Sequence, residues 1–94
     1  MREKEVEQYL VKKVKEIGGK AFKFTSPGNN GVPDRLVCLP GGRIVFVELK
    51  APGCKTRPDQ NNQMKKLHDL GCDVFVIDNK ETINGLVEFW REWP

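Results

Sequence analysis

The 94-residue sequence contains no apolar run near the ~20 residues that a membrane-spanning helix needs. Its first segment, MREKEVEQYLVKKVKEIGG, is charged throughout and lacks the apolar centre of a signal peptide. Only three cysteines occur, widely separated and odd in number, which does not suggest a disulfide framework. These absences lead us to expect a protein of the reducing cytoplasm with no membrane association.

The sequence also lacks a strong charge of either sign. Sixteen basic and 13 acidic residues give a net charge of +3. Such a mild excess permits nucleic-acid binding, whereas a protein that coats nucleic acid is usually more basic. It suits a protein that must keep a few carboxylates beside an anionic substrate. The length predicts one domain over residues 1–94, and a domain this small would gain buried area by forming a dimer.

Hydrophobic patterning predicts an α/β domain with the element order α-β-β-β-α-β-α. Alternating or short apolar runs predict strands over residues 20–25, 34–39, 43–50 and 73–78. The turn-forming sequence Pro-Gly-Gly at 40–42 joins the second and third strands, so these two should form a hairpin. A mixed four-stranded sheet with helices on both faces is the simplest way to bury the apolar stripes.

Three helices complete this prediction. The first covers about residues 3–17, where apolar residues recur at helical spacing, and it ends at two glycines. Pro58 suits the first turn of the second helix, whose apolar side would consist of Met64, Leu67 and Leu70. Asp78 is the expected N-cap of the last helix, with Glu81 three residues later as in a capping box.

Three charged residues stand where the hairpin would bring them together. Side chains alternate along a strand, so Glu48 and Lys50 share one face while Leu49 takes the other. Asp34 opens the second strand, opposite the end of the third, so it should lie beside them. Each signal alone is common, because Asp after Pro often opens a turn and Glu-x-Lys often lies on a solvated face.

Together these residues suit phosphodiester hydrolysis. Two carboxylates supply hard oxygen ligands for Mg²⁺ or Mn²⁺, which polarises a phosphate and lowers the pKa of a bound water. Lys50 could orient the attacking water, share in its deprotonation, or neutralise charge that develops at phosphorus. The sequence leaves these three roles open.

The motifs around these residues resemble a known superfamily. Pro33-Asp34 followed by Glu48-Leu49-Lys50 is similar to the PD-(D/E)xK nuclease signature. More narrowly, the series GVPDRLV, the PGG turn, FVELKAPG and RPDQ resembles the virus-type replication-repair nuclease (VRR-NUC) family. The resemblance extends from the first helix to the fourth strand, and it implies a restriction-endonuclease-like core with nuclease activity.

The resemblance also implies roles for individual residues. Asp34 and Glu48 would be metal ligands together with the backbone carbonyl of Leu49, and Lys50 would be the catalytic lysine. Gln60 matches a glutamine that the family places near the lysine, where its amide would position Lys50 or a phosphate oxygen.

The family also places a glutamate on the first helix, close to the metal. Glu7 is our choice for this ligand, and Glu3, one turn earlier on nearly the same face, is the rival. For both residues and for Gln60, an ordinary solvated position is the alternative.

Two loops are expected to frame the substrate. SPGNNG offers small residues and free N–H groups, and APGCKTRP carries two cations that could contact phosphates. The candidate DNA contacts are Ser26, Gly28, Asn30, Lys55 and Arg57.

The resemblance implies a Mg²⁺- or Mn²⁺-dependent DNA endonuclease that leaves 5′-phosphate ends. Family members of this size resemble phage or mobile-element proteins of replication, recombination or repair, so we expect a phage-encoded protein in a bacterial host. A homodimer acting on branched DNA such as Holliday junctions is expected, with a replication or recombination protein as a possible partner. The alternatives are a non-catalytic DNA-binding or assembly module with the same fold, and a sequence-specific restriction-like endonuclease.

Overall fold

The computed structural model describes residues 1–93, which form three helices and one four-stranded sheet. The helices are α1 (Glu3–Glu16), α2 (Pro58–Asp69) and α3 (Lys80–Arg91). The strands are β1 (Lys20–Lys23), β2 (Arg35–Leu39), β3 (Arg43–Leu49) and β4 (Asp73–Ile77). This arrangement confirms the predicted element order. Within residues 1–93, no helix is long and apolar enough to cross a membrane.

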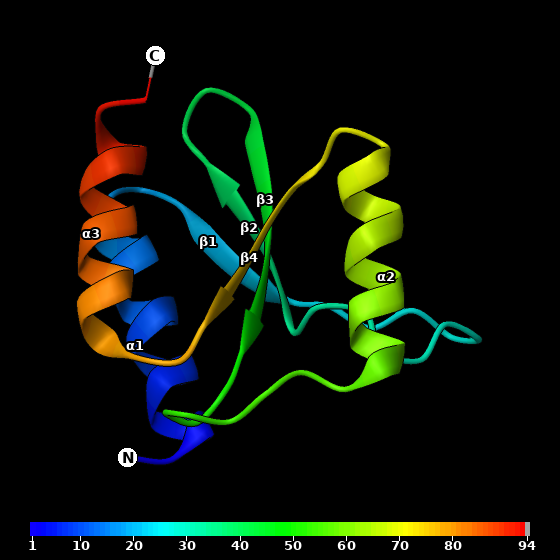
Figure 1. Ribbon diagram of the computed structural model, residues 1–94. Helices are drawn as coiled ribbons and strands as arrows, with labels where there is room; N and C mark the ends of the chain where they lie inside the picture. Colours follow the sequence, from blue (N-terminus) through cyan, green and yellow to red (C-terminus); the bar gives the residue numbers. More distant parts are fainter. Residues whose placement is uncertain (94) are drawn as a thin grey trace.

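The sheet is mixed, with strand order β1-β2-β3-β4 (Figure 1). β1 pairs antiparallel with β2, and β2 pairs antiparallel with β3 through the predicted turn at 40–42. β3 and β4 are parallel, which requires a crossover connection, and α2 lies within it. β3 is therefore held by a partner strand on each side, so the end of β3 is a rigid place for functional residues.

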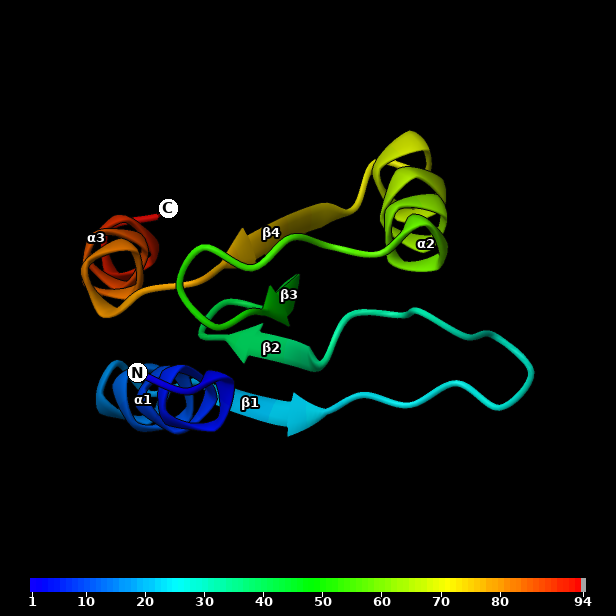
Figure 2. The same ribbon diagram turned by 60° about the horizontal axis from the view of Figure 1, so that its bottom comes forward.

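Helices lie on both sides of the sheet. α1 and α3 run side by side on one side, and α2 stands on the other (Figures 1 and 2). The core lies between the sheet and the α1–α3 pair, because Val37, Val45 and Val47 are fully buried on the face that these helices cover. The two helices contribute six buried apolar side chains to this core: Val6, Leu10, Val14, Ile83, Val87 and Trp90.

α2 differs from its prediction because it buries little apolar surface. Leu70 was expected on its apolar side but is exposed, while Met64 and Leu67 are only partly buried. The one buried side chain of α2 is Gln60. The helix therefore contributes more to the polar cleft described below than to the apolar core.

The expected N-cap of α3 was wrong by one residue. Asn79, not Asp78, is the N-cap, and its side-chain oxygen accepts a hydrogen bond of 2.7 Å from the Thr82 backbone N–H. Asp78 instead accepts bonds from the Gly53 backbone N–H at 3.3 Å and from the Asn79 amide at 2.8 Å. The Asp78 carboxylate thus ties the loop after β3 to the end of β4, a contact that local sequence does not reveal.

Two glycines provide a matched test of this packing. A Cβ at Gly19 would lie 2.7 Å from the Cys38 carbonyl oxygen and 3.0 Å from Val14 Cγ1, whereas a Cβ at Gly85 in α3 meets nothing within 4 Å. We predict that Gly19→Ala lowers the free energy of unfolding by about 1–3 kcal/mol, as overpacking does. Gly85→Ala should raise it by roughly 0.8–1 kcal/mol, the difference in helix propensity. Urea denaturation followed by circular dichroism measures both, and equal effects would contradict the described α1–β1 connection.

Candidate active site

The candidate site lies on the sheet face that looks toward α2. Glu48, near the end of β3, is 1% exposed, and Lys50, just beyond the strand, is 7% exposed. The Lys50 ammonium nitrogen lies 3.2 Å from Glu48 Oε2. Two opposite charges at this distance attract each other, which offsets part of the cost of burying them.

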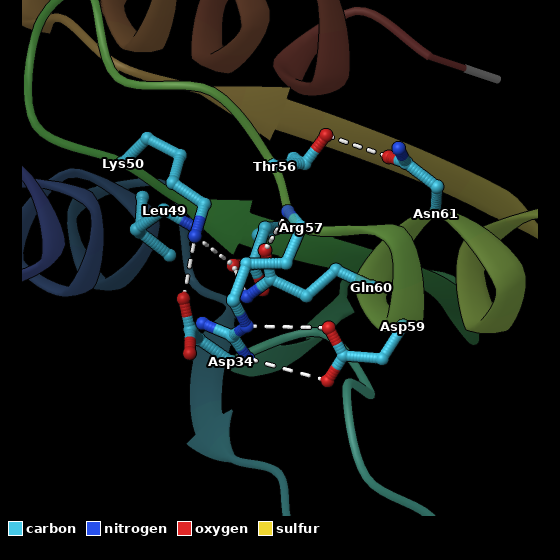
Figure 3. A network of polar contacts seen from close by, with 9 residues as sticks. Asp34, Leu49, Lys50, Thr56, Arg57, Asp59, Gln60 and Asn61 are labelled. Carbon is cyan, nitrogen blue, oxygen red and sulfur yellow. Dashed lines mark hydrogen bonds and ion pairs between the residues drawn. The ribbon is translucent and has the colours of Figure 1, made fainter.

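Asp34 is attached to the end of β3 by a backbone hydrogen bond. The Leu49 N–H donates to Asp34 Oδ2 at 2.9 Å (Figure 3). The next residue, Arg35, points to the opposite face, because side chains alternate along β2. The hairpin therefore brings Asp34, Glu48 and Lys50 into one cleft, as the sequence indicated, and Leu49 lies between them.

Gln60 connects this group to the start of α2. It is 5% exposed, and its Nε2 donates to Glu48 Oε2 at 2.6 Å. Its Oε1 accepts a bond of 2.9 Å from the backbone N–H of Arg57, the N-cap of the helix. Because both ends of the amide are engaged, Gln60 fixes the position of Glu48 relative to α2. Its direct side-chain partner is the Glu48 carboxylate rather than Lys50, and the predicted role in positioning Lys50 or a phosphate oxygen stays a prediction.

Burial and a neighbouring charge alter the acidity of Glu48. Desolvation, together with repulsion from Asp34, raises the pKa of Glu48 to about 7, although the hydrogen bond and positive charge of Lys50 act in the opposite direction. Its second oxygen, Oε1, is buried and has no hydrogen-bond partner among the described residues. A buried anionic oxygen without a partner is unfavourable unless a cation reaches it.

A cleft of about 370 Å³ opens beside these residues. Its lining includes Asp34, Glu48, Lys50 and Gln60, so all four proposed catalytic residues border the same space. One wall is formed by the loop between β1 and β2, and Glu3 and Arg57 contribute from α1 and from the start of α2.

The structure places Glu3 and Glu7, the two α1 candidates for a carboxylate near the metal, in different surroundings. Glu3 lines the cleft, whereas Glu7 does not. Glu7 Oε2 instead accepts a bond from Arg35 Nε at 2.8 Å and lies 3.9 Å from Lys23 Nζ. Since Arg35 points to the α1 side of the sheet, it engages Glu7 in an ion pair away from the cleft. Of the two α1 carboxylates, Glu3 therefore borders the cleft and Glu7 does not, while a role of either residue as a metal ligand stays a prediction.

The candidate DNA contacts are divided in the same way. Ser26, Asn30 and Arg57 line the cleft, while Gly28 and Lys55 are exposed outside its lining. Sequence reasoning did not single out Gly31, which has a φ of +88°. A Cβ there would come within 2.7 Å of the Asp59 carbonyl carbon and oxygen. The loop between β1 and β2 therefore contacts the first turn of α2 directly. In the sequence, a glycine within a turn-rich segment was the sign of this close contact.

The residues present fit a hard divalent cation. The carboxylates of Asp34 and Glu48 border the cleft, and Glu48 Oε1 lacks another partner. Within residues 1–93, no group of three or more His, Cys, Asp or Glu side chains is gathered to hold a metal. A donor set of two carboxylates suits Mg²⁺, which keeps several waters and often binds through one or two carboxylates. The Leu49 carbonyl as a further ligand stays a prediction, since Leu49 is not among the residues that line the cleft.

A restriction-endonuclease-like core with this Asp, Glu and Lys arrangement defines a nuclease of the PD-(D/E)xK class. A solved structure of a VRR-NUC domain superposes with a TM-score of 0.86 at 32% identity, covering 94% of this chain and 96% of that one. A protein of Acyrthosiphon pisum secondary endosymbiont phage 1, named "Putative nuclease p44", is 52% identical over 81 residues, which are 86% of this chain and 87% of the relative. No family model matches the sequence. The chain belongs to the VRR-NUC nuclease family.

The acidity of Glu48 predicts a pH-dependent stability. Its folded-state pKa of about 7 lies above its ordinary value of 4.5, so the folded protein holds this proton more tightly than the unfolded chain. The corresponding stability is fully present below about pH 4.5 and is lost as the pH rises through 7, by roughly 3 kcal/mol in total. In EDTA, Glu48→Gln should remove this pH-dependent loss of stability. The control Glu88→Gln changes an exposed glutamate and should show the same loss as wild type. Denaturation at pH 5 and 8 measures the difference, and parallel losses in wild type and Glu48→Gln would contradict the assigned pKa.

Proposed function

We propose that this nuclease is a divalent-metal-dependent DNA endonuclease, selective for branched DNA and active at the cleft of Asp34, Glu48 and Lys50. The observation that carries the proposal is the buried Glu48 carboxylate, which has one oxygen without a partner and stands beside a second carboxylate. A buried lysine lies next to it, 3.2 Å from Glu48 Oε2. Only a cation together with an anionic substrate makes use of all these groups.

Each residue has a defined task in this proposal. Asp34 and Glu48, with the Leu49 carbonyl, would hold Mg²⁺ or Mn²⁺, which supplies Lewis-acid polarisation of the phosphodiester when bound. Lys50 donates hydrogen bonds toward the phosphate and the attacking water, and offsets negative charge that develops at the phosphate oxygens. Gln60 keeps the Glu48 carboxylate oriented through its 2.6 Å hydrogen bond. The expected products carry 5′-phosphate ends.

The preference for branched DNA rests on size and on the open face of the sheet. The chain has 94 residues and carries no insertion large enough for elaborate reading of bases, so shape is a more accessible feature than sequence. By their strand register, the exposed residues Phe22, Ile44 and Val76 lie on the same sheet face as Glu48. An exposed apolar face supports a homodimer, which would present two active sites to a Holliday junction. A replication or recombination protein could supply further targeting.

A non-catalytic DNA-binding module is the second candidate function. It would need cations facing the phosphates, but here three carboxylates line the cleft: Glu3, Asp34 and Glu48. Without a metal these groups repel DNA, so the acidic lining favours catalysis over simple binding. A sequence-specific endonuclease would cut random linear duplexes only at its site, and branched substrates would give it no advantage.

Cleavage assays test the proposal directly. Wild-type protein should cut labelled flap or four-way-junction DNA with Mg²⁺ or Mn²⁺ but not with EDTA. Lys50→Ala should lower the rate by about 10²–10³-fold, as the loss of one transition-state donor does. Asp34→Asn, which keeps an acceptor for the Leu49 N–H, should abolish metal-dependent cutting while preserving the fold.

Metal binding provides a readout that does not depend on activity. Mn²⁺ should raise the melting temperature of wild type but not of Asp34→Asn or Glu48→Gln. Folded wild-type protein that binds DNA, gains no stability from Mn²⁺ and cuts nothing would support the binding module instead.

The dimer has a separate test. Light scattering coupled to gel filtration should give twice the mass of the 10.7 kDa chain, and a double Phe22→Ser, Ile44→Ser variant should reduce it to the monomer. The exposed Phe89 on α3 offers a control, because Phe89→Ser leaves this sheet face unchanged. A wild-type mass of one chain at micromolar concentration would exclude the homodimer.

A further inference from the structure

Arg57 is the cation of the cleft that a substrate can engage. Among the described lining residues, three are acidic and two are basic, namely Lys50 and Arg57. Lys50 is buried and lies 3.2 Å from Glu48 in the free protein, whereas the Arg57 side chain is exposed at the edge of the cleft. A phosphodiester that enters beside Glu3, Asp34 and Glu48 therefore depends on Arg57 for positive charge from the protein surface.

The guanidinium of Arg57 is held by a weak and replaceable partner. Its Nε lies 3.2 Å from Asp59 Oδ1 and its Nη2 lies 3.5 Å from Oδ2 (Figure 3). The two side chains are 61% and 43% exposed, and solvent screens such pairs until they contribute little to stability. Asp59 itself is not part of the cleft lining. The guanidinium can therefore leave Asp59 at little energetic cost when a doubly accepting anion is present.

Helix capping does not explain an arginine at this position. Residue 57 is the N-cap of α2, where Ser, Thr, Asp or Asn would accept a hydrogen bond from the first turn. A guanidinium has no acceptor, and Arg57 makes no side-chain cap bond. Gln60 compensates in part by accepting the Arg57 backbone N–H at 2.9 Å. A residue that is unfavourable for the helix and borders the cleft is expected to serve function.

We propose that Arg57 exchanges Asp59 for the substrate and binds two non-bridging oxygens of the phosphodiester in the cleft. The fork of guanidinium donors matches two phosphate oxygens, which a lysine cannot do. Asp59 holds the guanidinium at the cleft edge until DNA arrives. This inference rests on the proposed function and assigns Arg57 as the phosphate-binding residue of that site.

Four variants test this exchange: Arg57→Ser, Arg57→Lys, Asp59→Asn and the double variant that combines Arg57→Ser with Asp59→Asn. Arg57→Ser should lower kcat/KM for branched DNA by about 10²-fold, and Arg57→Lys should recover only part of that loss. Arg57→Ser should also reduce the slope of log binding constant against log salt concentration by about one, the value for one lost phosphate contact, measured with Ca²⁺. Because serine is a better N-cap, the same variant should melt about 4 °C higher than wild type.

The aspartate variant probes the resting contact. Asp59→Asn should tighten DNA binding by up to about fivefold by freeing the guanidinium. In an Arg57→Ser background, the same change should have a smaller effect, and a double-mutant cycle measures this coupling.

Arg91→Ser is the matched control, because Arg91 forms a similar exposed pair with Glu88 at 3.3 Å on α3. It should leave cleavage and the salt slope unchanged. If Arg57→Ser retains wild-type kcat/KM and salt slope, as the control does, the inference is overturned while the nuclease assignment stands. If wild-type protein binds DNA without cutting it, the proposed function fails, and the salt slopes still decide whether Arg57 contacts phosphate.

Discussion

The buried contact between Glu48 and Lys50 is the constraint on which the functional site depends. A carboxyl group and an ammonium group that are 1% and 7% exposed must lie close together to offset part of the cost of burial, and this requires a fixed backbone at both residues. β3 meets this requirement because it pairs with β2 and β4. The raised pKa of Glu48 shows that Lys50 does not fully compensate for burial and for repulsion from Asp34. A carboxyl group with a pKa raised by burial and by a neighbouring charge is typical of active sites.

The residues around Glu48 and Lys50 explain why α2 buries a polar side chain rather than an apolar stripe. The helix buries one side chain, Gln60, and that side chain bonds the Glu48 carboxylate. Its first turn also supports the loop between β1 and β2 at Gly31, where only a glycine fits. Its N-cap residue, Arg57, lies in the cleft lining. α2 and its N-cap thus contribute Gln60 and Arg57 to the cleft lining and support the loop at Gly31, while the helix buries little apolar surface.

Much of this arrangement could be predicted from sequence, because it follows from local rules. Alternation along β3 placed Glu48 and Lys50 on one face, and the turn at 40–42 fixed where Asp34 would lie. Local rules could not decide which α1 carboxylate borders the cleft, since Glu3 and Glu7 share a helix face. The choice depends on Arg35, whose pairing with Glu7 arises only when the sheet packs on α1.

We propose that Asp34 and Glu48 share one divalent cation, and an anomalous diffraction map of crystals soaked with Mn²⁺ would locate it. We expect one strong peak in the cleft, coordinated by both carboxylates and adjacent to Lys50. A map with no peak there, or with Glu48 still contacted by Lys50 and Gln60 alone at saturating Mn²⁺, would contradict this proposal.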